Sequence, residues 1–195
     1  MEFKKIQLNG FKSFAEKADF LIEDGLTGIV GPNGCGKSNI VESLRWAMGE
    51  TSAKSMRGSG MEDVIFSGTS NKASKNIAEV TIEVENKDKE GPIQYREHDQ
   101  IQIKRKIEKD KGSKFYLNGK EVRARDAQMF FADLSTGAHS PSMISQGRIG
   151  ALVTAKPTDR RAILEEAAGI SGLHVRRHEA ELRLGAAENN LKRAD

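Results

Sequence analysis

Apolar and polar residues alternate in several stretches of the chain, a pattern typical of β-strands with one buried face. Ile6 and Leu8 alternate with polar neighbours near the amino terminus, and the pattern resumes over residues 20–22. It returns strictly at residues 78–84 and again between residues 101 and 107. We therefore predict strands at the amino terminus and an antiparallel meander from residue 78 onward.

The meander is expected to close with a tight hairpin. Residues 115–122 carry Asn118-Gly119 at their centre, a dipeptide that favours a type I′ turn. A short helix is predicted from about Ala124 to Leu134, followed by a Gly-, Ser- and Pro-marked loop through residue 147. Residues 49–60 lack any apolar period and are predicted to form a surface loop.

A different arrangement precedes residue 49. Residues 26–30 form a short apolar run that predicts a buried strand, and residues 38–48 have the pattern of a helix. Between them lies Gly-Pro-Asn-Gly-Cys-Gly-Lys-Ser, which fits the phosphate-loop pattern G-x-x-x-x-G-K-S/T at every constrained position. Because strand, loop and helix come in the order that this motif requires, the sequence predicts a nucleotide-binding site.

Each residue type of this loop has a chemical role. Glycines at 31, 34 and 36 are expected to adopt positive φ angles, so that backbone N–H groups converge on a phosphate at the positive end of the helix dipole. Lys37 supplies a charge to the β- and γ-phosphates, and the Ser38 hydroxyl is placed to bind Mg²⁺. The predicted phosphate-binding residues are Gly31, Pro32, Asn33, Gly34, Cys35, Gly36, Lys37 and Ser38.

The chain changes character after residue 157. Thr158 is expected to cap a helix, and a charged run follows with apolar residues at heptad spacing. The stripe consists of Leu173, Ala180, Leu184, Ala187, Leu191 and Ala194, with Arg177 interrupting it. We predict a domain at residues 1–157 and the start of a coiled-coil arm at residues 158–195. The alternative is an amphipathic surface helix that folds back on the domain.

Composition narrows the functional classes only a little. The 195 residues carry 31 basic and 28 acidic side chains, and a net charge of +3 does not by itself indicate a nucleic-acid partner. With no apolar run of transmembrane length and no signal-peptide pattern, we expect a soluble, cytoplasmic protein without a membrane partner. The single cysteine, Cys35, excludes a disulfide framework and a Cys-rich metal site.

A hydrolase built on this loop also needs an apolar strand that ends in an acid able to hold Mg²⁺. Residues 20–24 end in acids but precede the loop, and residues 129–133 lie in a helical pattern. Leu-Ser-Thr-Gly at residues 134–137 resembles the Leu-Ser-Gly-Gly signature of ABC-type ATPases, but Thr136 replaces a glycine that must approach the γ-phosphate. We expect half of the catalytic machinery to lie outside this chain, which alone should be inactive.

Five stretches form a further pattern: residues 10–14 (Gly-Phe-Lys-Ser-Phe), 31–39, 63–66 (Asp-Val-Ile-Phe), 145–147 (Ser-Gln-Gly) and 165–170 (Glu-Glu-Ala-Ala-Gly-Ile). In this order and spacing they resemble the amino-terminal half of the head of structural maintenance of chromosomes (SMC) proteins, most like the bacterial chromosome-segregation type. The resemblance implies an α/β fold, the amino-terminal lobe of an ABC-type P-loop ATPase, with a mixed sheet and an antiparallel meander leading into a long coiled-coil helix. The missing carboxy-terminal lobe would carry the signature motif, the Walker-B strand and the water-polarising Glu.

The same resemblance implies residue roles and the cofactors ATP and Mg²⁺. Gln146 would touch Mg²⁺ and the attacking water, Lys12, Ser13 and Asn39 would lie beside the nucleotide, and Arg57 would couple DNA binding to hydrolysis. The implied catalytic residues are therefore Lys37, Gln146 and Arg57, and the implied metal ligands are Ser38 and Gln146.

The resemblance also implies a set of partners. ATP would be sandwiched against the signature motif of a second head, so that binding assembles a homodimer of heads and hydrolysis releases it. Further partners would be the carboxy-terminal lobe of the same chain, a kleisin subunit at the neck helix and double-stranded DNA. The candidate DNA contacts are Lys104, Arg105, Lys106, Lys109, Lys111, Lys114, Lys120, Arg123 and Arg125, although charges on edge strands are most often simply solvated.

Three alternatives are weighed against this interpretation. A RecN- or RecF-like DNA-repair ABC ATPase shares the phosphate loop, but residues 11–14 and 165–170 favour the SMC family. A small-molecule kinase would need an acceptor site and a lid within this length, and the predicted coiled-coil helix at its end argues against that class. A purely structural coiled-coil adaptor would not need the phosphate-binding residues Lys37 and Ser38, so their presence argues against that class.

Overall fold

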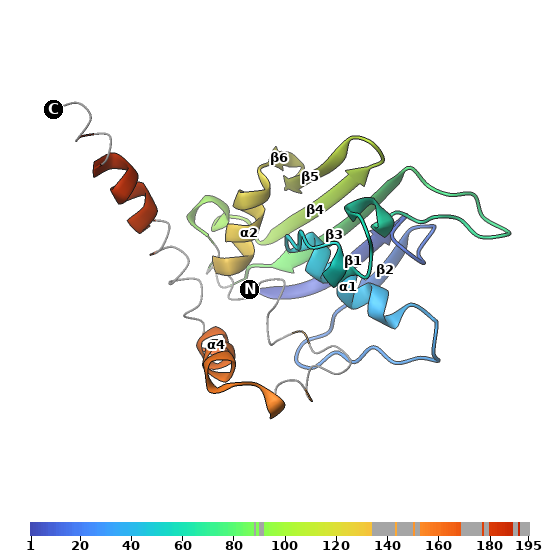
Figure 1. Cartoon of the computed structure of the whole chain (residues 1–195), viewed down its shortest axis with the longest axis horizontal. Helices are drawn as coiled ribbons and strands as arrows, with labels where there is room; N and C mark the ends of the chain where they lie inside the picture. Colours follow the sequence, from blue (N-terminus) through green and yellow to red (C-terminus); the bar gives the residue numbers. More distant parts are fainter. Residues whose placement is uncertain are drawn as a thin grey trace.

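One antiparallel sheet carries most of the fold in the computed structural model of the chain (Figure 1). The structure describes residues 1–87, 89, 92–133, 143, 150, 153–168, 177, 180–188 and 191. Six strands pair in the order β2-β1-β3-β4-β5-β6, and each neighbouring pair is antiparallel. The strands are β1 (Glu2–Asn9), β2 (Ala18–Leu21), β3 (Ile77–Glu85), β4 (Gln100–Glu108), β5 (Gly112–Leu117) and β6 (Lys120–Val122).

Two helices pack against this sheet and share its hydrophobic core. Helix α1 (Lys37–Ala47) contacts β3 and β4, and α2 (Ala124–Asp133) contacts β5. Three short 3₁₀ helices, η1 (Lys54–Met56), η2 (Met61–Val64) and η3 (Ile93–Tyr95), lie in the connections, and α4 (Pro157–Ala167) follows later in the chain. The described residues therefore form a mixed α/β lobe with an antiparallel sheet, as the sequence predicts.

The core follows from the alternation along the central strands. Every second residue of β3 from Ala78 to Val84 is buried, and Ile101, Ile103 and Ile107 of β4 continue the same face. Trp46 at the end of α1 is fully buried against them, in one cluster with the aromatic residues of α2. Burial of this face gives the lobe its main stabilisation, since apolar area removed from water is the dominant favourable term in folding.

Several local predictions are confirmed. Asn118 and Gly119 both have positive φ, 46° and 79°, which is the backbone of a type I′ turn between β5 and β6. Helix α2 begins at Ala124 as predicted, and α1 begins at Lys37, one residue earlier than its apolar pattern indicates.

The predicted strand at residues 26–30 is not formed. No strand is assigned there, and Leu26 and Val30 are 94% and 91% exposed. A strand needs a neighbour to satisfy its N–H and C=O groups, and none of the six described strands pairs with this segment. An apolar segment therefore lies in solvent immediately before the phosphate loop.

The loop prediction for residues 49–60 is wrong in part. This stretch contains η1, and the Met56 side chain is buried in the main core. A single apolar side chain is enough to anchor a short connection, but it produces no periodic pattern that sequence analysis could detect.

The described residues show no coiled coil. Helix α4 ends at Ala167, and residues 180–188 are helical, but residues 169–176 fall outside the described part. Leu184 and Leu191 of the predicted stripe are 63% and 70% exposed. Leu173 and Ala194 lie outside the described residues, and the proposed division at residue 157 stays a prediction. None of the described helices is long and apolar enough to span a membrane.

Candidate nucleotide-binding site

The phosphate loop runs directly into α1, and two of its glycines have backbone angles that favour glycine. Gly34 and Gly36 have φ of 84° and 96°, in the left-handed region. The expectation of positive φ at Gly31 is wrong, because this residue is not in that region. Steric crowding favours glycine at position 31 instead, since an added Cβ would lie 3.0 Å from the Cys35 Sγ atom.

Gly36 is the most constrained position of the loop. A Cβ added there would lie 2.9 Å from the Ser13 Oγ atom and 3.3 Å from Cζ of Phe14. The residue also forms the N-cap of α1, and the first turn of this helix contains no acidic side chain. The positive end of the helix dipole is therefore not offset by a carboxylate in its own first turn, a favourable setting for an anion.

Lys37 folds back over its own loop. Its Nζ atom donates hydrogen bonds to the carbonyl oxygens of Gly31 and Pro32, both at 2.6 Å, and lies 3.9 Å from the Cys35 Sγ atom. The ammonium group is thus held at the loop, where its charge can meet a phosphate. Ser38, the predicted magnesium ligand, is exposed in the first turn of α1.

The amino-terminal turn of residues 10–14 packs against the start of α1. The Asn39 side-chain amide donates to the Ser13 hydroxyl at 2.8 Å, and the Lys12 backbone N–H donates to the carbonyl of Val64 at 2.7 Å. Buried Phe11 contacts Trp46 with ring centroids 5.5 Å apart. The structure therefore brings Lys12, Ser13 and Asn39 together beside the phosphate loop, as the predicted site requires.

Glu42 joins these residues to Arg57, and sequence analysis missed it. One carboxylate oxygen accepts from the ammonium of Lys12, and the other lies 2.5 Å from Nε of Arg57. Arg57 also donates from Nη2 to the Asn39 side-chain oxygen at 2.9 Å, and Lys12 donates to the Met56 carbonyl. A usable clue was present in the sequence, since residues 39 and 42 share one face of a helix at spacing i, i+3.

The loop that carries Arg57 is fixed by an acidic residue of the matching stretch 63–66. Asp63 accepts hydrogen bonds from the backbone N–H and hydroxyl of Ser59, at 2.6 and 2.8 Å, and from the Gly60 N–H at 3.0 Å. The hydrogen bond from the Gly60 backbone lowers the pKa of the Asp63 carboxyl below its usual range, and the hydrogen bonds from Ser59 lower it further. Arg57 itself has a left-handed backbone with φ of 54°, so its position is set by a defined turn.

Other predicted site residues are not brought into this arrangement. Gln146 lies outside the described residues, as does the Leu-Ser-Thr-Gly stretch, so the predicted magnesium pair of Ser38 and Gln146 stays a prediction. Within the described ranges no three His, Cys, Asp or Glu side chains come close enough to hold a metal ion.

The prediction that Arg105 contacts DNA is wrong. Its side chain occupies an inward position of β4, and the residue is only 4% exposed. Its Nη1 atom donates to the carbonyls of Trp46 and Glu50, both at 2.7 Å. The guanidinium lies over the rings of Trp46 and Phe115, at 4.5 and 4.7 Å from their centroids. Burial lowers the pKa of Arg105 to about 10, so the group stays charged at neutral pH.

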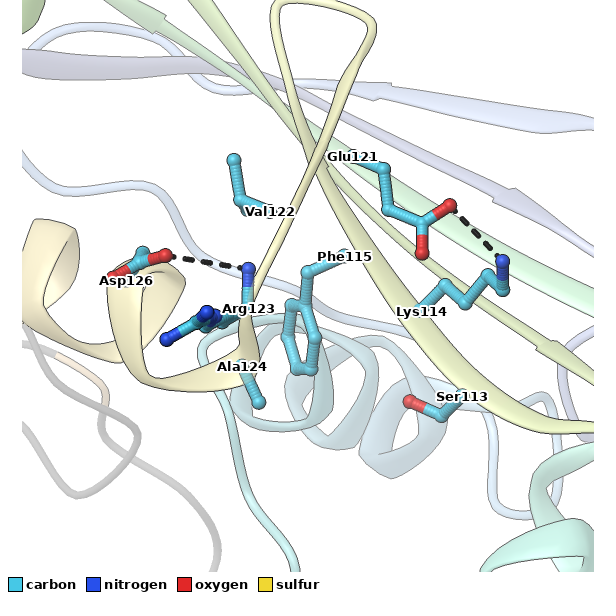
Figure 2. Close-up of a pocket in the computed structure, with 8 residues that line it drawn as sticks. All are labelled: Ser113, Lys114, Phe115, Glu121, Val122, Arg123, Ala124 and Asp126. Carbon is cyan, nitrogen blue, oxygen red and sulfur yellow. Dashed lines mark hydrogen bonds and ion pairs between the residues drawn. The ribbon is translucent and has the colours of Figure 1, made fainter.

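Several other candidate DNA contacts are paired with acidic neighbours. Lys106 lies 3.8 Å from Glu79, and Lys111 lies 2.6 Å from Glu108. A hollow of about 610 Å³ lies where β5, β6 and α2 meet. Lys114 and Glu121, 3.0 Å apart, line it (Figure 2). Its lining consists of Ser113, Lys114, Phe115, Glu121, Val122, Arg123, Ala124 and Asp126. With two basic and two acidic side chains, the lining itself is not strongly cationic.

Fold and loop together define a class of protein: a P-loop nucleotide-binding lobe in which α1 carries the loop and packs on an antiparallel sheet. Residues 2–148 match the family model described as the RecF/RecN/SMC N terminal domain. The chain belongs to this family, and it corresponds to the amino-terminal head region of bacterial chromosome partition proteins of the Smc type.

Curated relatives and solved structures agree on this placement. The chain is 56% identical over its whole length to the chromosome partition protein Smc of Rhodopseudomonas palustris and 57% identical to that of Cereibacter sphaeroides. It spans 17% of the length of each of these relatives.

Two solved structures superpose on the described fold. The Smc head bound to the C-winged helix domain of ScpA matches with a TM-score of 0.78 and 32% identity, over 87% of this chain and 52% of that one. A structure from work on ATP-driven dimerization and DNA-stimulated activation of SMC ATPases matches with a TM-score of 0.74 and 30% identity, over 86% and 99% of the two chains.

Proposed function

We propose that this chain is the ATP-binding half of an SMC-type ATPase head, in which ATP binding brings two heads together and hydrolysis releases them. The observation that carries the proposal is the phosphate loop at the start of α1, with Lys37 held over it. A related SMC ATPase is described by its ATP-driven dimerization. The chain's matching curated relatives include eight chromosome partition proteins Smc, which favours this function over a RecN- or RecF-like repair ATPase.

The exposed segment at residues 26–30 supports the need for a second lobe. Leu26 and Val30 would be costly to leave in water, since burying such a side chain is worth about 1.5–3 kcal/mol. A strand from a carboxy-terminal lobe would cover them and satisfy their backbone groups. We therefore propose that the active head combines both lobes, and that this chain alone does not turn over ATP.

The proposed chemistry assigns a role to each site residue. Lys37 and the loop N–H groups bind the phosphates, and Lys12, Ser13 and Asn39 line the nucleotide. Ser38 and Gln146 would hold Mg²⁺, whose charge would offset the phosphates, with Gln146 also near the attacking water. Arg57 would link the nucleotide to DNA.

The proposed partners follow from the relatives. A kleisin subunit would bind at residues 158–195. One related head is bound to the C-winged helix domain of ScpA, which supports a partner of this kind but not its place on the neck helix. Double-stranded DNA would contact the lobe through Arg123, Arg125 and outward lysines such as Lys104, and the related SMC ATPase is described as DNA-stimulated. The protein would act on the chromosome in the cytoplasm.

The test is ATP binding by a head that contains both lobes. Replacing Lys37 by Ala should weaken ATP binding roughly 10-fold or more, because a charge-assisted hydrogen bond contributes ~1.5–3 kcal/mol. Lys87→Ala is the matched control, since this lysine is 73% exposed beside Glu85, which pairs with the start of β1 and not with the end that leads into the site, and it should leave ATP affinity unchanged. Equal ATP affinity of the Lys37→Ala variant and the unsubstituted head would refute the loop assignment.

A further inference from the structure

We propose that Glu42 sets the nucleotide affinity of this site, because its carboxylate competes with the nucleotide phosphates for the Arg57 guanidinium. The proposal rests on the proposed ATP-binding function and adds a regulatory residue to it. Glu42 would act through Arg57 and Lys12, without contact to the nucleotide, and is therefore a positioning residue.

A single carboxylate serves two cations that come from different loops. Lys12 follows β1, Arg57 follows η1, and Glu42 lies in the second turn of α1 between them. The Glu42 side chain is 10% exposed, so its charge is poorly solvated and depends on these two partners. Removing the carboxylate charge would leave both cations with an unmatched positive charge near the phosphate loop.

The two cations differ in their freedom to leave Glu42. Lys12 is mostly buried and is also held by the Met56 carbonyl, so it stays in place. Arg57 has a 58% exposed side chain, and its second partner is the neutral side-chain oxygen of Asn39. An exposed guanidinium can exchange one anion for another at little cost in burial, and phosphate is a strong competitor because it also binds Arg through paired hydrogen bonds.

Glu42 is also close enough to the phosphate loop for its charge to matter. Ser38 and Glu42 are four positions apart in α1 and share one helix face, about 6 Å apart along the axis. A phosphate bound at Lys37 and Ser38 would therefore lie within a Debye length of the carboxylate. When the carboxylate keeps Arg57, it both repels the nucleotide and withholds a cation from it.

The experiment is a double-mutant cycle on ATP binding by the head with both lobes. The four proteins are the unsubstituted head, Glu42→Gln, Arg57→Ala and the double variant, each titrated with ATP at low and high salt. Glutamine keeps the shape and can still accept a hydrogen bond from Lys12 or Arg57, so only the charge is removed. Glu79→Gln is the matched control, since it removes one charge from an ion pair on the opposite face of the sheet.

Glu42→Gln should bind ATP about 3- to 5-fold more tightly at low salt, the range of one partly exposed charge interaction. The gain should shrink at high salt and become clearly smaller when Arg57 is Ala, because the competition for the guanidinium is then gone and only the direct repulsion by the carboxylate is relieved. Glu79→Gln should leave the affinity unchanged. Unchanged or weaker binding by Glu42→Gln, or the same gain without Arg57, would overturn the proposal. A residue with a purely structural role would lower the affinity in both backgrounds.

A measurement on the unsubstituted head keeps the proposal testable if Glu42→Gln fails to fold. The NMR signal of the Arg57 Nε–H group should shift on addition of ATP as the guanidinium leaves Glu42, and no shift would overturn the exchange. Absence of ATP binding by the unsubstituted head would overturn both proposals, whereas normal ATP binding without a Glu42 effect would overturn this one alone.

Discussion

Replacing Arg105 by Met should destabilise the lobe by about 2–4 kcal/mol, because it breaks a buried polar network at the end of α1. Methionine fills much of the same space, so cavity formation contributes little. The loss comes from the carbonyls of Trp46 and Glu50 and from the Ser113 hydroxyl, all of which accept hydrogen bonds from the guanidinium.

Two opposing effects set the magnitude of this loss. Burial lowers the pKa of Arg105 to about 10, which corresponds to a cost of roughly 3 kcal/mol for the charged form. Each hydrogen bond from a charged donor stabilises the folded lobe by about 1.5–3 kcal/mol, and each aromatic ring beneath the guanidinium adds about 1 kcal/mol. The interactions therefore outweigh the cost of burial. Removing only the arginine leaves its acceptors behind, and an acceptor left buried without a donor costs ~1–3 kcal/mol.

Urea unfolding provides the assay. Trp46 is the single tryptophan and lies against the guanidinium, so its fluorescence reports the site, and far-UV circular dichroism reports the whole lobe. Lys104→Met is the matched control on the outward face of β4 and should stay within about 0.5 kcal/mol of the unsubstituted chain. An Arg105→Met variant as stable as that control, with an unchanged dependence on urea, would refute the reasoning.

Two further predictions concern the phosphate loop and the turn after Arg57. Cys35 is exposed, and its Sγ atom lies 3.9 Å from the Lys37 ammonium. Alkylation of this thiol should block ATP binding, and ATP with Mg²⁺ should slow the alkylation. Equal alkylation rates with and without ATP would place the thiol away from the bound phosphates. Asp63 has a lowered pKa in the folded chain, so the stability it provides should be complete above pH 3.8 and lost as the pH falls through the lowered value. Asp63→Asn should lack this acid-side loss in pH-dependent unfolding, and an identical profile would contradict the assignment.

Sequence patterns predicted the parts of the fold that depend on local interactions. The alternation of Ala78–Val84 places its apolar residues on the core face, and Asn118-Gly119 forms the expected turn. Lys12, Ser13 and Asn39 were assigned to one site by resemblance, and the structure places them together. In these cases the structural feature is specified by a few neighbouring residues: an alternation of period two, a turn dipeptide or a known motif.

The misses share one cause, which is dependence on distant segments. The residues at 26–30 have the composition of a buried strand, but no described strand pairs with them. Arg105 lies in a basic run that suggests a solvated edge, yet its position in the register of β4 directs it to the core beneath α1. Glu42 has no motif of its own. Its spacing from Asn39 places it on the same helix face, but the sequence does not show that Lys12 and Arg57 converge on it in three dimensions.

These distant contacts explain how the lobe can hold a phosphate loop in place. Helix α1 is fixed at its carboxyl end by Arg105 from β4, in its middle by Glu42, and at its start by Ser13, which packs against Gly36. Among the residues that the structure describes, none gives comparable support to the side of the loop that precedes Gly31, because residues 26–30 are exposed. The described part of this lobe therefore orders the helix side of the phosphate site, and leaves residues 26–30 on the strand side without a pairing strand.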